Sequence, residues 1–204
     1  MNLADPVRFE RTLAAFDAAN REDPHTDHDE EGNAVPKELL YALRMSAVLS
    51  EYAPEASEAL QLAARCQHIR RWTVPRDSYP MDRKGYLQWR TGLKKFHGEQ
   101  ATEIMQAQGY DTGTIKQVVD LLNKKNLKRD PTRRDPEMQT LEDVICLVFL
   151  RYYLSEFIPQ HSEEKVISII AKTWEKMSER GHEAALKVDF SPEEKQVIEQ
   201  ALER

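Results

Sequence analysis

Three polar side chains that can bind a metal ion or move a proton occupy positions where a helix would face a core. His68 and His97 each come four residues after an apolar residue of a predicted helix, so they share its inner face. Asp143 comes four residues before Leu147 in a nearly all-apolar stretch. Two imidazoles and a carboxylate from three helices suit a divalent metal ion or an acid–base site. We therefore predict His68, His97 and Asp143 as catalytic residues and as ligands of a divalent metal.

These three residues also have a structural interpretation. A histidine on the inner face of a helix is alternatively a hydrogen-bonded core residue. Thr140 followed by Asp143 is close to the pattern of a capping box, and an acid in the first helical turn is stabilised by the helix dipole by about 0.3–1 kcal/mol. The sequence leaves both interpretations open.

A basic stretch interleaved with aromatic residues is the second candidate for chemistry. Residues 65–95 carry nine basic side chains and two acidic ones, in a chain whose net charge is -6. Guanidinium groups bind phosphate or carboxylate in pairs of hydrogen bonds and stack on rings. Arg44 lies apart among apolar residues, and a buried arginine needs a carboxylate or a ligand anion as partner. The predicted substrate-binding residues are Arg44, Arg71, Trp72, Arg76, Arg83, Tyr86, Trp89 and Arg90.

The elements that must position these residues are helices. Apolar residues recur with the helical period, and the alternation typical of strands is absent, so a sheet is not expected. Residues 22–36 form a polar loop, and Ser191 followed by Pro and two Glu is a strong helix start. About eight helices are predicted, over residues 5–20, 36–54, 55–72, 83–108, 114–124, 141–154, 161–180 and 191–204.

Length and composition favour one globular all-α domain. Hydrophobic residues make up 40% of the 204 residues and charged residues 31%, enough for one core. We predict a single helical bundle over residues 1–204, with a core over about 36–158 and helices of 161–204 packed on it. No apolar run reaches the roughly 18 residues of a membrane span, and no secretory signal is expected from the charged first turns. Cys66 and Cys146 are predicted to be reduced core residues, which favours a cytoplasmic location.

Several runs of the chain are similar to a family known in bacteria and fungi. They are PKELLYALRMSAVL, SEALQLAARCQHIRRWTVPRDSYPMDRKGYLQWRTGLKKFHGEQ, QTLEDVICLVFL and KTWEKMSERGH. The pattern QHIxRW followed by GYLxWR resembles a family described as a domain of unknown function. This resemblance implies membership and no particular activity.

A second resemblance is to HD-type phosphohydrolases of the alarmone-hydrolase kind, which are all-helical metalloenzymes. Arg44 stands where that pattern has its first His, and His68 is followed by Ile69 where the pattern has His-Asp. Asp143 resembles the late Asp, and His97 resembles the extra His of some members. The resemblance implies an HD-like fold with a degenerate ligand set.

Two main functional hypotheses follow. The first is a phosphohydrolase-like enzyme that acts on a nucleotide or another phosphorylated small molecule in an Arg/aromatic pocket. The second is a non-catalytic module that binds a nucleotide or an RNA end, favoured by the replacement of two of the four HD-type ligands. A third hypothesis, a helical adaptor, requires the Arg/aromatic stretch to be a protein interface.

Overall fold

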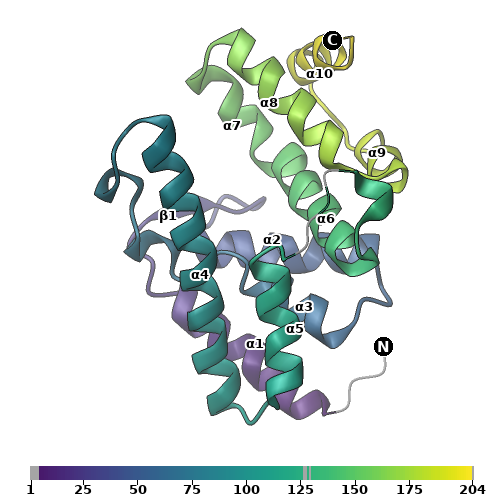
Figure 1. Cartoon of the computed structure of the whole chain (residues 1–204). Coiled ribbons are helices and arrows are strands. Elements are labelled where there is room, and N and C mark those ends of the chain that lie inside the picture. Colours follow the sequence, from purple (N-terminus) through teal and green to yellow (C-terminus); the bar gives the residue numbers. More distant parts are fainter. Residues whose placement is uncertain (1–4, 126–127, 129, 204) are drawn as a thin grey trace. The chain divides into compact units, whose positions relative to one another are not determined.

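A computed structural model describes residues 5–125, 128 and 130–203 of the chain. The chain forms two compact units, residues 1–125 and 126–204. Most of the described residues are helical, as predicted (Figure 1). The prediction of a single domain over residues 1–204 stays a prediction.

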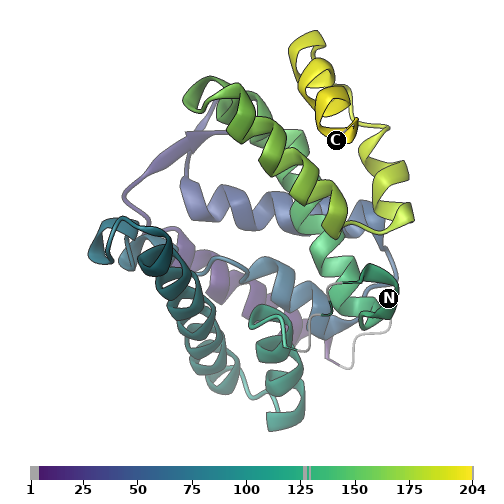
Figure 2. The same cartoon turned by 45° about the horizontal axis from the view of Figure 1, so that its top comes forward.

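The N-terminal unit holds every predicted site residue except Asp143. Its helices are α1 (Pro6–Asn20), α2 (Lys37–Tyr52), α3 (Glu58–Arg65), η1 (Arg71–Thr73), η2 (Arg76–Ser78), α4 (Arg83–Ala107) and α5 (Thr112–Leu122), and its strands are β1 (Thr26–His28) and β2 (Ala34–Pro36). The α4 and α5 helices pack side by side, and α3 packs on both α2 and α5 (Figures 1 and 2).

Local sequence signals explain where these helices begin and end. Asp5 accepts a hydrogen bond from the Arg8 backbone N–H and is followed by Pro6, so α1 begins where the sequence predicts. Asp111 caps α5 in the same way. Gly109 has a φ of +80°, a backbone conformation that glycine adopts without strain, and it follows the end of α4.

Two predictions about the N-terminal unit are wrong. The polar loop 22–36 contains a short antiparallel hairpin, in which Asp27 pairs with Val35, so the described chain does include a two-stranded sheet. The helix predicted over 55–72 ends at Arg65. Arg70 has a φ of 51°, a left-handed conformation that a right-handed α-helix does not contain. Its backbone N–H donates to the buried Asn20 side chain. His68 therefore lies in a turn and not on a helix.

The regular elements of the described part of the C-terminal unit are all helices. Its elements are η3 (Pro131–Arg133), α6 (Pro136–Tyr152), α7 (Leu154–Phe157), η4 (Ile158–Gln160), α8 (Glu163–Lys176), α9 (Glu179–Ala185) and α10 (Pro192–Leu202). The α7, α8 and α9 helices pack on α6, and α10 packs on α8. Most of the α6 side chains are buried, as its apolar sequence predicts.

The boundaries in this unit differ from the prediction at two places. Asp135 and Pro136 begin α6 five residues before Leu141, so Asp143 lies beyond its first turn. The predicted helix 161–180 divides into α8 and α9 because Met177 has an extended backbone and Ser178 caps a new helix. The described ranges therefore hold ten α-helices, against the predicted eight. The capping box at Ser191 is confirmed, whereas Arg204 lies outside the described residues.

Two further observations bear on the predicted environment of the chain. Cys66 and Cys146 are both buried, as predicted. No helix within residues 5–125 and 130–203 is long and apolar enough to cross a membrane.

Candidate functional site

Four ionisable side chains meet in the N-terminal unit, and we call them the Glu38 cluster: Glu38, His68, Arg71 and His97. An Oε2 atom of Glu38 lies 3.4 Å from Nδ1 of His68. A terminal nitrogen of Arg71 lies 3.2 Å from both ring nitrogens of His68. The rings of His68 and His97 are 5.9 Å apart between centroids. The structure thus brings two of the three predicted catalytic residues together with one predicted substrate-binding arginine.

Buried hydrogen bonds hold Glu38 and His97 in place. The buried Asp23 carboxylate accepts the Glu38 backbone N–H at 3.0 Å, which satisfies a donor at the start of α2. His97 Nδ1 donates to the carbonyl oxygen of Ile69 at 2.9 Å. This bond leaves Nε2 of a neutral His97 as the unprotonated nitrogen.

The ring of His68 is fixed by stacking. Tyr41 lies parallel to it, with centroids 4.1 Å apart and an angle of 13° between the planes. The His68 side chain is 23% exposed and Arg71 is partly exposed, whereas Glu38 and His97 are buried. His68 and Arg71 are therefore the members of the cluster with the greater exposure to solvent.

Burial sets the protonation states of the cluster. Burial raises the pKa of Glu38 to about 7, partly countered by the positive charge of Arg71. Burial, with the His68 ring as a second cause, lowers the pKa of His97 to about 3. Burial and the charge of Arg71 lower the pKa of His68 well below its usual value. At neutral pH both imidazoles are uncharged and Glu38 exchanges its proton, so the cluster can accept or donate a proton next to a fixed positive charge.

The remaining predicted arginines of the N-terminal unit differ in what they contact. Arg76 donates to the carbonyl oxygens of Tyr79, Pro80 and Asp82 at 3.1, 2.7 and 3.2 Å, so it holds the loop before α4. Arg83 is exposed in the first turn of α4. Arg90 is exposed, with its guanidinium 5.7 Å from the centre of the Tyr86 ring.

The predicted aromatic residues form the other half of this region. Trp89 is buried, donates from Nε1 to the carbonyl oxygen of Val74 at 2.9 Å, and lies 5.2 Å from the Arg71 guanidinium. Trp72 is partly exposed on η1, and Tyr86 is exposed. The Trp89 ring therefore lies within cation–π distance of the Arg71 guanidinium.

Arg44 meets the carboxylate partner that its burial requires. Its Nε donates to Oε1 of Glu30 at 3.1 Å, and a terminal nitrogen donates to the carbonyl oxygen of His28 at 3.1 Å. Both partners belong to the hairpin region, so Arg44 ties the hairpin to α2. Asp29 stabilises the turn of this hairpin, because its carboxylate accepts hydrogen bonds from the backbone N–H groups of Glu31 and Asn33.

Asp143 belongs to the C-terminal unit, where its carboxylate joins two helices. One oxygen accepts the Ser178 backbone N–H at 2.8 Å and Gln139 Nε2 at 2.9 Å, and the other accepts the Ser178 hydroxyl at 2.6 Å. A Cβ added at Gly181 would lie 2.7 Å from the same carboxylate. The capping interpretation is thus wrong for its own helix, since Asp143 instead anchors the start of α9.

The prediction that His68, His97 and Asp143 bind a metal ion stays a prediction. The Asp143 carboxylate is engaged by Ser178 and Gln139, whereas the hydrogen bond from His97 Nδ1 to the Ile69 carbonyl leaves Nε2 open to a ligand. Across residues 5–125, 128 and 130–203 there is no group of three or more His, Cys, Asp or Glu side chains placed to hold a metal ion.

Sequence reasoning missed Glu38 and Asp23. Glu38 comes three, four and seven residues before Tyr41, Ala42 and Met45, which are half-buried or buried on the same face of α2. That spacing was available in the sequence. Asp23 offered no such signal, because a loop residue has no periodicity to reveal its burial.

Comparisons with known proteins give one match. A family model described as "Domain of unknown function (DUF4202)" matches residues 10–198. No curated protein and no solved structure matches the chain.

Proposed function

The chain belongs to the DUF4202 family of unknown function, and from the site itself we propose that the N-terminal unit binds a phosphorylated small molecule, such as a nucleotide, and hydrolyses its phosphate ester. The observation that supports this proposal is the contact of His68 with both the Glu38 carboxyl and the Arg71 guanidinium. Hydrolysis of a phosphate ester needs a positive charge that binds the phosphate and a group that transfers a proton to the leaving oxygen. Arg71 can supply the charge, and Glu38 with His68 can transfer the proton.

Arg71 is the proposed anion-binding residue. Its guanidinium is partly exposed, lies against His68 and is supported by the Trp89 ring at 5.2 Å. A planar guanidinium held in this way binds two phosphate oxygens without first losing much side-chain freedom. Trp72, the next residue along η1, supplies a partly exposed indole for a base or sugar of the substrate.

Glu38 and His68 are the proposed proton-transfer residues. In hydrolysis the water oxygen forms a bond to phosphorus, the ester P–O bond breaks, and the proton lost by water ends on the leaving oxygen. His68 takes the proton of the water on Nε2 and gives its Nδ1 proton to ionised Glu38, 3.4 Å away, and the reverse transfer delivers a proton to the leaving oxygen. No step of this proposal requires a metal ion.

Ligand-dependent thermal stability tests the binding part. A nucleoside monophosphate or sugar phosphate at about 100 times its Kd stabilises the fold by about 2.7 kcal/mol, so wild type should show a raised Tm with at least one member of a panel. Arg71→Gln should lose that shift, whereas Arg21→Gln, an exposed arginine of the same unit, should keep it. A panel that shifts no Tm contradicts the proposal.

Release of inorganic phosphate from the ligand that binds tests the catalytic part. Glu38→Gln should bind and not turn over, because an amide cannot accept the proton. The alternative, a non-catalytic nucleotide- or RNA-end-binding module, is favoured by the low exposure of Glu38, whose side chain is 11% exposed. Binding without phosphate release in wild type would select that alternative. The HD-like fold stays a hypothesis resting on the sequence resemblance.

A further inference from the structure

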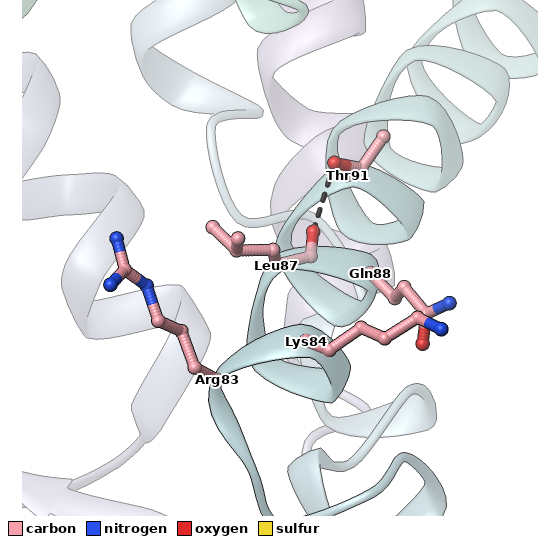
Figure 3. A pocket seen from close by; sticks show the side chains of 5 residues that line it. All are labelled: Arg83, Lys84, Leu87, Gln88 and Thr91. Carbon is pink, nitrogen blue, oxygen red and sulfur yellow. Dashed lines mark hydrogen bonds between the residues drawn. The ribbon is translucent and has the colours of Figure 1, made fainter.

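Three exposed apolar side chains lie just before α4 or in its first turns. Met81 is 75% exposed, Leu87 53% and Tyr86 42%. A shallow hollow of about 650 Å³ lies beside Leu87, and its wall is mostly apolar. Figure 3 shows its lining side chains, all on α4: Arg83, Lys84, Leu87, Gln88 and Thr91. A hollow with an apolar wall, close in sequence to further exposed apolar side chains, is a feature of binding sites.

The surroundings of this hollow are basic. Arg83 and Lys84 line it and extend to different sides of the helix (Figure 3). Both are exposed, and α4 has no acidic residue before Glu99. An apolar centre with a basic edge complements an apolar side chain flanked by carboxylates.

We propose that this face, Met81 to Thr91, is a docking surface for an acidic amphipathic segment of a partner protein. An apolar side chain of the segment enters the hollow beside Leu87, and its carboxylates pair with Arg83 and Lys84. This recognition corresponds to the binding of an amphipathic helix through apolar anchors at helical spacing.

The aromatic rings favour a protein partner over a nucleic acid. Single-stranded nucleic acid stacks its bases on free ring faces. Here the Tyr86 ring already has the guanidinium groups of Arg76 and Arg90 at 5.9 and 5.7 Å, and Trp89 is buried. The two most exposed apolar side chains of this face, Met81 and Leu87, are aliphatic, which suits an apolar side chain of a protein partner.

Fluorescence anisotropy of the full chain with three labelled probes tests this inference. The probes are a short peptide of Glu, Leu and Ala with its leucines at helical spacing, a scrambled peptide of the same composition, and a U-rich single-stranded RNA. The variants are Leu87→Gln and the pair Arg83→Glu, Lys84→Glu. The controls are Leu186→Gln, another exposed leucine, and Lys195→Glu, an exposed lysine of α10.

The charge-reversal pair is designed to leave the fold intact. Arg83 and Lys84 are the first two residues of α4, where acidic side chains are favoured by the helix dipole. Retained helical circular dichroism and Tm in this variant therefore separate loss of binding from loss of structure.

The inference expects the amphipathic peptide to bind and the scrambled peptide to bind at least about tenfold more weakly. Each Leu87 or charge-reversal variant should lose at least about tenfold in affinity, with the controls unchanged. The inference is overturned if both peptides bind equally or if only the RNA binds. It is also overturned if Leu87→Gln leaves the affinity for the amphipathic peptide unchanged. A concentration-dependent dimer that Leu87→Gln abolishes also overturns it, because the occupant would then be a second copy of the chain. None of these outcomes depends on the Glu38 cluster.

Discussion

Replacing the buried Glu38 by Gln should stabilise the protein at neutral and higher pH. Burial raises the pKa of Glu38 from 4.5 to about 7, so the folded state holds a proton that the unfolded state has released across that interval. A raised folded pKa contributes stability that is fully present below pH 4.5 and is lost as the pH rises through about 7. Glutamine resembles the protonated side chain and cannot ionise, so Glu38→Gln should escape this loss.

The size of the effect follows from the pKa shift. Each pH unit between the two pKa values is worth about 1.4 kcal/mol, so the free energy of unfolding of wild type should fall relative to Glu38→Gln by about 3 kcal/mol in all. The nearby Arg71 reduces the penalty of the charged form and is already among the causes of the shift.

Urea unfolding of both proteins at several pH values provides the assay. The variant and wild type should have similar relative stability below pH 4.5, and the variant should gain on wild type up to about pH 7 and keep that advantage above it. Glu10→Gln, at an exposed position of α1, controls for the substitution itself. The argument that burial disfavours the ionised form of Glu38 would be refuted by a stability difference between variant and wild type that does not change with pH. A variant less stable than wild type at pH 8 would refute it as well.

Three other substitutions test the structure away from this carboxyl. The pKa of His97 is lowered to about 3, so wild type should lose up to about 1.4 kcal/mol per pH unit as the pH falls below 6.5, and His97→Gln should show a shallower loss in the same urea series. Asp143→Asn should lower the free energy of unfolding by about 2–3 kcal/mol, because two hydrogen bonds from Ser178 lose their charged acceptor, and a Tm unchanged from wild type would contradict this role. Gly181→Ala, which stabilises an ordinary helix by about 1 kcal/mol, should destabilise this one, since the new Cβ meets the Asp143 carboxylate at 2.7 Å, and calorimetry showing a raised Tm would contradict it.

Most helices could be predicted from the helical period of the apolar residues and from N-cap residues in the sequence. Asp5 before Pro6 and the Ser191 capping box each predicted a helix start that the structure confirms. The α3 boundary was missed because its cause is tertiary: the buried Asn20 side chain binds the backbone of Arg70 in a left-handed turn. The hairpin was missed because three-residue strands are too short to alternate visibly.

Inward-facing polar residues were found more easily than their partners. The burial of His97 was predicted from apolar neighbours in the sequence, and so was the need of Arg44 for either a carboxylate or a ligand anion, of which the structure shows the carboxylate of Glu30. The grouping of His68 and His97 with Asp143 rested on three inward positions, and position on a helix does not say which partner a side chain meets. Asp143 meets Ser178, thirty-five residues away, and only the folded chain reveals that contact.

The titration of the histidine ring resonances with a nucleoside monophosphate tests the central claim most directly. NMR of ¹³C-labelled histidine in the full chain should show a saturable shift of the His68 ring that is lost in Arg71→Gln and retained in Arg21→Gln. If the His68 resonance stays fixed while other rings such as His161 or His182 move, or if no ring moves with any phosphorylated compound of the panel, the Glu38 cluster is not a phosphate-binding site.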